Sequence, residues 1–310
     1  MKLADAVARY VEHKQSMGMR FHTERRTLKS FCQWLGETDL AQIEPDPVHA
    51  FLAGTGPVTR FWQRKHEVLA GFYRFAVARG YVTNSPLPRT VPKPSQHFVP
   101  YIFSLAELKR LLDATESCER SRGAMTAATC RTLLLLLYGT GLRISEALSL
   151  TLADVDLDRA FLAVRESKFY KTRLLPIGPD LQGILSQYLD RRPGDRDADS
   201  RFIVSRTGTA VSRAAAEGAF CRLRQHANVL RHDDARYQPR LHDIRHTFAV
   251  HRLVSWYRAG ADVQRLLPHL ATYLGHVNIA ATQRYLTLTP ELLAEASERF
   301  EHYAMGGHHD

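Results

Sequence analysis

The residues best suited to chemistry lie in four short stretches between residues 140 and 286. In TGLRISEALSL, Arg143 follows a glycine turn at the start of a helix. Its planar guanidinium could clamp a phosphate through two parallel hydrogen bonds, or it could simply pair with Glu146. In LHDIRHTFAVHRL, His242 and Arg245 are three residues apart and therefore share one helical face. Projecting together near a helix start, these two side chains are suited to binding an anion.

The other two stretches hold a lysine, a histidine and a tyrosine. Lys168 lies at the turn of the predicted hairpin RESKFYKTRLLPIG, where a solvated lysine is common, and Lys171 follows three residues later. YLGHVNIAATQRYL contains His276 directly after a glycine and Tyr285 nine residues further on, across a short turn and a helix. Because a helical tyrosine most often packs in a core, this stretch alone assigns no chemistry to Tyr285.

No motif predicts a metal or cofactor site. His242 and His246 have the HxxxH spacing, but the glutamate that serves as general base in the HExxH zinc motif is not present. The cysteines are far apart in the sequence and form no CxxC pair, which predicts neither a zinc site nor a disulfide framework and fits a reducing cytosol. They are Cys32, Cys118, Cys130 and Cys221.

The composition indicates a folded, basic protein. The chain has 310 residues, 45% of them hydrophobic and 24% charged, and is long enough for two domains. Its 42 Lys and Arg against 32 Asp and Glu give a net charge of +10. This balance favours nucleic acid as the partner and an acidic membrane second, although a basic protein with neither partner has the same composition. The N-terminal helix is too charged for a signal peptide, and the apolar run Thr132–Leu142 is too short to span a bilayer, so we expect a cytoplasmic protein.

The hydrophobic periodicity predicts a mostly α-helical protein of two domains. Residues 1–85 carry short amphipathic helices. Five prolines between Pro86 and Pro100 predict an extended linker over residues 86–100. Residues 101–310 then form the second domain. The third helix of the first domain has a predicted basic face made of Arg60, Arg64, Lys65 and Arg74.

The second domain is predicted to combine helices with a small antiparallel sheet. Ser104 and Glu107 form a capping box that opens a helix, and a long apolar helix from Ala124 is expected to stop at Gly139. FLAVRES and KTRLLPIG have the composition of strands that pair as a hairpin, and RFIVS that of a third short strand. Later helices are predicted at residues 212–225, 241–258, 262–273, 278–286 and 290–300.

The order Arg, hairpin Lys, His-x-x-Arg, Gly-His and Tyr closely resembles that of the tyrosine recombinase (phage integrase) family, over essentially the whole chain. TGLRISEALSL resembles the family's first-arginine box, LHDIRHTFA its His-x-x-Arg box and LGHVNIAATQRYL its histidine and nucleophile box. The resemblance implies the DNA breaking-rejoining fold, with a helical, SAM-like core-binding domain before an α+β catalytic domain. It also implies a set of catalytic residues, namely Arg143, Lys168, His242, Arg245, His276 and Tyr285.

The chain departs from the family pattern at two places. The family's hairpin commonly contains Gly-Lys-Gly, whereas Lys168 lies between Ser167 and Phe169. The catalytic lysine is therefore either Lys168 or Lys171. The run LLPHLATYLGH is also longer and richer than the commonest form of that helix, which could alter contacts with a partner.

The activity implied by the resemblance is site-specific DNA recombination. Strands are cut and rejoined through a 3′-phosphotyrosine intermediate without metal, ATP or cofactor, since the phosphotyrosyl link conserves the energy of the broken bond. Tyr285 is then the nucleophile. Arg143, Arg245 and His276 stabilise charge on the non-bridging phosphate oxygens. His242 accepts the proton of the tyrosine, and either hairpin lysine, with Lys168 preferred, protonates the departing 5′ oxygen.

The implied partner is double-stranded DNA clamped by both domains, in a homotetramer with or without other recombinase subunits. The last predicted helix, LTPELLAEASERF, either packs on its own domain or docks on a neighbouring protomer. Integration, transposition and resolution of a mobile element all use this chemistry, and the sequence does not separate them. A type IB topoisomerase-like enzyme and a non-catalytic DNA-binding regulator are the alternatives; the separate helical domain disfavours the first, and the complete residue set disfavours the second.

Overall fold

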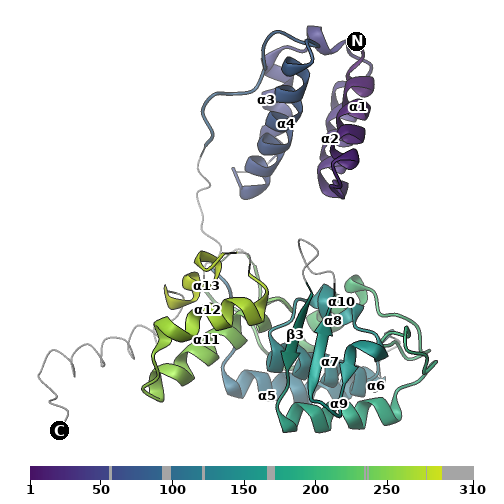
Figure 1. The fold of residues 1–310 in the computed structure, drawn as a ribbon, viewed down its shortest axis with the longest axis vertical. Coiled ribbons are helices and arrows are strands. Elements are labelled where there is room, and N and C mark those ends of the chain that lie inside the picture. Colours follow the sequence, from purple (N-terminus) through teal and green to yellow (C-terminus); the bar gives the residue numbers. More distant parts are fainter. Residues whose placement is uncertain are drawn as a thin grey trace, which may run out of the picture. The chain divides into compact units, whose positions relative to one another are not determined.

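The computed structural model describes residues 1–55, 58–92, 99–120, 123–165, 172–233, 235, 237–276 and 278–287. The chain divides into two compact units, Met1–Phe98 and Val99–Asp310, each of which buries its own hydrophobic core (Figure 1). Within the described ranges, no helix is long and apolar enough to cross a membrane.

The first unit consists of helices that bury their apolar faces against one another. The third α-helix has Pro45 at its first position, and the fourth begins after Thr59, whose hydroxyl oxygen accepts a hydrogen bond from the amide of Phe61 (3.2 Å). Phe31 and Phe72 are fully buried in the core. The elements are α1 (Leu3–Ser16), α2 (His22–Leu35), the 3-10 helix η1 (Leu40–Gln42), α3 (Pro45–Ala53) and α4 (Arg60–Ala78).

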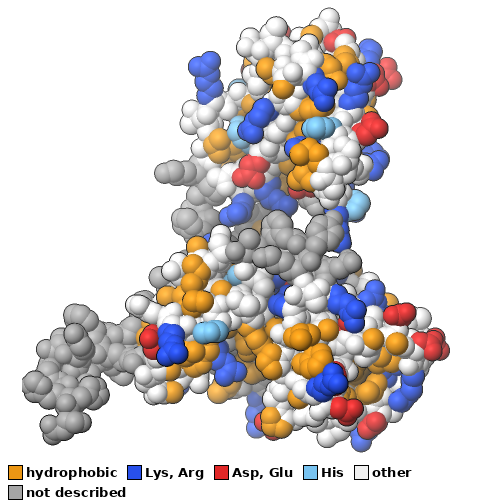
Figure 2. Space-filling model, in the orientation of Figure 1, with side chains coloured by type: hydrophobic (Ala, Val, Ile, Leu, Met, Phe, Trp, Pro, Cys, Tyr) orange, Lys and Arg blue, Asp and Glu red, His pale blue; other side chains and the backbone are white. Residues whose placement is uncertain are grey.

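The predicted basic face of α4 is wrong at one position. Lys65 is buried, because its ammonium donates a hydrogen bond to the carbonyl of Phe51 and lies 4.9 Å and 5.3 Å from the ring centroids of Phe51 and Phe61. A lysine can bury its aliphatic stem in this way when aromatic rings and a carbonyl receive its charge. The arginines at positions 60, 64 and 74 are exposed. On the face shown in Figure 2, Lys and Arg side chains lie over both units.

The second unit packs helices around a small sheet. The predicted capping box of Ser104 and Glu107 is confirmed at the start of its first helix. The helices are α5 (Leu105–Asp113), α6 (Ser117–Arg120), α7 (Ala127–Thr140), α8 (Ile144–Ser149), α9 (Pro179–Arg191), α10 (Arg213–His226), α11 (Asp243–Arg258), α12 (Val263–Leu274) and α13 (Ala280–Gln283). Short 3-10 helices add η2 (Ala114–Glu116), η3 (Leu152–Asp154) and η4 (Arg284–Thr287). The predicted helix at 290–300 lies outside the described residues.

The sheet contains β1 (Val155–Asp156), β2 (Phe161–Val164) and β3 (Arg173–Pro176), antiparallel and in the order β1-β2-β3. The predicted hairpin pairing of β2 with β3 is confirmed. It places Leu162 opposite Leu175, and both side chains are fully buried. The hairpin turn, residues 166–171, lies outside the described residues.

The predicted third strand, RFIVS, is buried but does not join this sheet. The amide of Phe202 donates to the carbonyl of Leu150 (2.8 Å), and Val204 forms only an isolated bridge with Ala210. The backbone of this run thus finds hydrogen-bond partners outside the sheet, while the side chains of Phe202 and Ile203 fill the core. The prediction of a strand at RFIVS is therefore wrong, since the run forms isolated bridges and no strand.

The helix α7 lies at the centre of the second unit and packs against α9 and α11 (Figure 1). It continues through Gly139, where we predicted its end, and stops at Gly141 instead. The reason is conformational: Gly141 has φ +62°, the left-handed conformation that favours glycine. A Cβ at this position would lie 2.5 Å from Cδ1 of Phe248 and 2.8 Å from Cδ2 of Leu274.

The fold also brings two cysteines together that the sequence separates. The sulfur atoms of Cys118 and Cys130 are 3.0 Å apart, and both side chains are buried. The spacing of these two cysteines in the sequence did not predict this contact. The contact forms because α6, which contains Cys118, packs against α7, which contains Cys130.

Replacing Gly141 with alanine should destabilise the second unit by about 2–4 kcal/mol, from left-handed strain plus displacement of the two neighbouring side chains. The matched control is Gly183→Ala, because Gly183 lies inside α9 with no neighbouring atom within 4 Å of an added Cβ. This control should be neutral or stabilising by up to about 1 kcal/mol. Urea denaturation of the three proteins gives the comparison. Equal midpoints for Gly141→Ala and wild type would contradict it.

Candidate active site

Arg143 and Glu146 are held together at the start of α8. Oε1 of Glu146 accepts a hydrogen bond from Nη1 of Arg143 (2.8 Å), and Oε2 accepts one from the backbone amide of Arg143 (2.9 Å). Nη2 of Arg143 donates to the carbonyl of Gly275 (3.3 Å). The pairing of Arg143 with Glu146 that the sequence left open is therefore present. The Arg143 side chain remains 27% exposed, so it can still receive a ligand.

A second arginine, Arg173 on β3, binds the same carboxylate of Glu146. Its Nη1 and Nη2 donate to the two oxygens of Glu146 (3.2 and 2.9 Å), and its Nε donates to the carbonyl of Tyr273 (3.0 Å). Arg173 was not among the residues predicted from the sequence, although a charged side chain within the apolar run RLLPIG was a usable signal. Its guanidinium also explains one glycine: a Cβ on Gly275, which has φ +67°, would lie 2.8 Å from Nη1 of Arg173.

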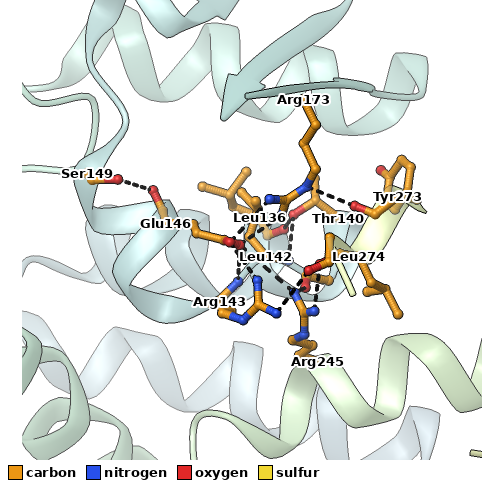
Figure 3. A network of polar contacts seen from close by, with 12 residues as sticks. Leu136, Thr140, Leu142, Arg143, Glu146, Ser149, Arg173, Arg245, Tyr273 and Leu274 are labelled. Carbon is orange, nitrogen blue, oxygen red and sulfur yellow. Dashed lines mark hydrogen bonds and ion pairs between the residues drawn. The ribbon is translucent and has the colours of Figure 1, made fainter. Parts of the chain in front are cut away.

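Arg245 projects from the first turns of α11 into the same cluster (Figure 3). Its Nη1 donates to the carbonyl of Gly141 (2.7 Å), and its Nη2 donates to the carbonyl of Leu274 (2.6 Å). Nη1 also lies 3.9 Å from Oε2 of Glu146. Burial, together with the charge of Arg143, lowers the pKa of Arg245 to about 10. The side chain therefore stays charged at neutral pH.

Glu146 is the shared counterion of these arginines. Figure 3 shows the guanidinium groups of Arg143, Arg173 and Arg245 directed at its carboxylate. Burial favours the neutral acid, but the hydrogen bonds from Arg173 and from the amide of Arg143 outweigh it, and the pKa of Glu146 falls to about 2. The carboxylate is ionised at any physiological pH and fixes the arginines in place.

Tyr285 lies in η4 with its side chain only 3% exposed. Its hydroxyl is 3.1 Å from Nδ1 of His246. Its ring stacks on that of His276, with 6.1 Å between centroids and 24° between planes. Burial raises the pKa of Tyr285, while the charges of Arg245 and Arg143 oppose that rise. The tyrosine is therefore protonated at neutral pH and close to the arginines.

The histidines around Tyr285 are neutral at pH 7. Burial and the charge of Arg245 lower the pKa values of His242 and His276 to about 4. Nδ1 of His276 is 2.7 Å from Oγ1 of the fully buried Thr282, which fixes the orientation of the imidazole. The ring of His242 meets that of His246 edge to face, with centroids 5.0 Å apart.

The structure thus brings five of the six predicted site residues into one region, from segments far apart in the sequence: Arg143, His242, Arg245, His276 and Tyr285. Lys168 and Lys171 lie outside the described residues. The sequence analysis gave no role in the site to Arg173, Thr282 or His246, because their importance follows from tertiary contacts. Among the described residues, no cluster of His, Cys, Asp and Glu could hold a metal ion.

A helical unit with a small antiparallel sheet and arginines beside a buried tyrosine defines the DNA breaking-rejoining class of proteins. Residues 103–291 match the model of the phage integrase family, and the chain belongs to this family of site-specific DNA recombinases. A putative integrase/recombinase, y4rB of Sinorhizobium fredii (strain NBRC 101917 / NGR234), is 34% identical, with 96% of each chain covered.

Two further comparisons agree on family and fold. The tyrosine recombinase XerD of Caulobacter vibrioides is 30% identical over 83% of this chain and 81% of its own. A lambda integrase, crystallised as a tetramer bound to a Holliday junction, has a TM-score of 0.70 at 18% identity, covering 92% of this chain and 77% of the integrase. The structural likeness at this identity establishes the fold.

Replacing Glu146 with glutamine should lower the free energy of unfolding by about 3 kcal/mol at pH 7, the value that corresponds to the depressed pKa of this buried carboxylate. The contribution is present above the ordinary pKa of about 4.5 and is lost as the pH falls towards 2, so the variant and wild type should converge over that interval. Urea denaturation at pH 7, 4 and 3 measures this difference. Glu217→Gln, which breaks an exposed pair with Arg213, should cost less than about 0.5 kcal/mol. If the difference in free energy of unfolding between Glu146→Gln and wild type were the same at all three pH values, ionisation of Glu146 would not be its cause.

Proposed function

We propose that the chain performs site-specific recombination by attacking a DNA phosphodiester with Tyr285, which forms a 3′-phosphotyrosine and releases a 5′ hydroxyl. The observation that carries this proposal is the convergence on one region of Arg143, Arg245, His276 and Tyr285 from separate elements. Phosphoryl transfer requires mainly position and charge stabilisation, and this cluster supplies both.

Arg143 and Arg245 are the residues that we expect to bind the phosphate oxygens. Arg245 is fixed by two carbonyls and Arg143 by Glu146 and one carbonyl, so both guanidinium groups are preorganised before a ligand binds. Preorganised donors stabilise developing charge without a cost of reorganisation. His276, held by Thr282, adds a neutral hydrogen-bonding group beside the tyrosine.

The departing 5′ oxygen needs a proton, and the hairpin between β2 and β3 is the expected source. We assign this role to Lys168, with Lys171 as the alternative. His242, which the family resemblance suggested as acceptor of the Tyr285 proton, is the N-cap residue of α11, four residues before His246. The new bond conserves the energy of the old one, so the reaction reverses without ATP.

Double-stranded DNA is the proposed partner, consistent with the net charge of +10. A homotetramer is the proposed working assembly, by analogy with the lambda integrase tetramer on a Holliday junction. The segment expected to dock on a neighbouring protomer, residues 290–300, lies outside the described residues. We propose that the protein acts in the cytoplasm.

Membership of the recombinase family disfavours both a topoisomerase-like function and a non-catalytic regulator function. The same chemistry serves integration, transposition and resolution equally.

The Tyr285→Phe variant should form no covalent protein–DNA adduct and should bind DNA with unchanged affinity, because only the hydroxyl oxygen is lost. Nicked duplexes made from the DNA that flanks the gene, incubated without metal and run on a denaturing gel, would show the adduct of the wild type. An adduct of normal yield with Tyr285→Phe would exclude Tyr285 as the nucleophile.

Arg143→Ala should slow adduct formation by about 10²–10³-fold, the usual loss for one preorganised oxyanion donor. Glu146 would keep Arg173 as its partner, so the fold should survive. Arg213→Ala is a matched control, because its exposed guanidinium pairs only with Glu217 on its own helix in the described contacts. The measurement is the single-turnover rate of adduct formation on the same nicked duplex. A decrease in this rate of less than fivefold would show that Arg143 is not a catalytic residue.

A further inference from the structure

The hydroxyl of Tyr285 contacts a histidine to which neither the family motifs nor the sequence analysis gave a role. Nδ1 of His246 lies 3.1 Å from the phenolic oxygen, and the two rings are 5.6 Å apart with 57° between their planes. His242, the expected proton acceptor, instead packs edge to face against the ring of His246. We propose that His246 takes the phenolic proton of Tyr285 as this oxygen attacks the scissile phosphate. The inference rests on the proposed function.

The protonation states of the pair fit this role. Burial keeps the proton on Tyr285 by raising its pKa. Burial, with the charges of His242 and Arg245, lowers the pKa of His246 to about 3, so its imidazole is neutral at pH 7 and one ring nitrogen carries no proton. Between a phenol and a neutral imidazole the phenol is the stronger acid. We therefore assign the hydrogen bond as donated by Tyr285 to Nδ1 of His246.

Bound DNA would make His246 a better base. The titratable and charged groups that influence His246 or Tyr285 come from several elements: His242, Arg245, Arg240, His276, Arg143 and Arg284. They are cations or histidines, and they disfavour a second positive charge on His246. A phosphodiester placed on Arg143 and Arg245 brings a negative charge that offsets part of this repulsion. The basicity of His246 thus rises when the substrate is in place.

The phenolic O–H bond of Tyr285 breaks and its proton moves to Nδ1 of His246. An oxygen lone pair of the phenol forms the new bond to phosphorus. The bond between phosphorus and the 5′ oxygen breaks, its electron pair stays on that oxygen, and the hairpin lysine supplies the proton for the leaving hydroxyl. In the rejoining direction every transfer reverses, and His246 returns the proton to Tyr285.

The helix α11 fixes the position of His246 opposite the hydroxyl of Tyr285. His246 directly follows Arg245 on α11, and Arg245 is anchored by two carbonyl oxygens. His242, four residues earlier at the N-cap of this helix, packs edge to face against the imidazole. One rigid helix therefore presents both the phosphate-binding guanidinium and the group that faces the nucleophile.

The test compares His246→Gln with His242→Gln in single-turnover cleavage of a nicked duplex that yields an adduct with wild type and none with Tyr285→Phe. Glutamine can still accept a hydrogen bond but cannot take up a proton at neutral pH. We expect His246→Gln to cleave about 10²–10⁴-fold more slowly at pH 7, with DNA affinity within a few-fold of wild type.

The pH dependence separates proton transfer from positioning. With a neutral base the wild-type rate should be flat from pH 6 to 9. His246→Gln must use the ionised tyrosine, so its rate should rise about tenfold per pH unit, while His242→Gln should keep the flat profile whatever its absolute rate. A slow His246→Gln with a flat profile, or a steep profile for His242→Gln alone, overturns the proposal.

Chemical rescue of a second variant by imidazole tests the proposal if His246→Gln folds poorly. His246→Ala leaves space beside the Tyr285 hydroxyl, and added imidazole should restore cleavage in proportion to its concentration at pH 7. The absence of rescue in a folded, DNA-binding variant counts against His246. If wild type itself forms no adduct on any nicked duplex, the proposed function fails. An adduct with wild type and equal rates for His246→Gln would overturn this inference alone.

Discussion

The buried carboxylate of Glu146 is the interaction on which the site depends. Arg143, Arg173 and Arg245 come from a helix cap, a strand and a second helix, and their mutual repulsion would drive them apart without a shared counterion. Removing one partner from such a buried group leaves uncompensated charge, which is far more costly than losing a surface pair. The arginine cluster, the sheet and the two helices are therefore held as one unit.

The C-terminal end of α12 supplies the second half of this framework. Its last carbonyls are taken in succession by three arginines: Tyr273 accepts from Arg173, Leu274 from Arg245 and Gly275 from Arg143. Carbonyls at a helix end have no partner within the helix and carry the negative end of its dipole, so cations are their natural ligands. Because His276 is the next residue, its position is set by the same bonds.

The sequence predicted most of the helices and the β2–β3 hairpin, because each rests on local periodicity. Five candidate site residues came from the order of their motifs and the family resemblance, and the structure brings these five side chains into one region. Prediction from the sequence failed where distant contacts decide. Gly139 and Gly141 are equally plausible helix ends until Phe248 and Leu274 are seen against the second. Arg173 and His246 have no special spacing, and their importance appears only when Glu146 and Tyr285 are brought beside them.

The charge of the site explains why its histidines are neutral. Arg143, Arg173 and Arg245 share the single negative charge of Glu146, so the cluster keeps an excess of positive charge. Under the proposed function, Arg143 and Arg245 offer this charge to a phosphate. Two guanidinium groups suit a diester with one negative charge and the further charge that develops as the nucleophile adds. Protonated imidazoles at His242, His246 and His276 would add repulsion that the buried arginines could not relieve. Neutral histidines avoid this repulsion, and under the proposed function a neutral His246 can accept the phenolic proton of Tyr285.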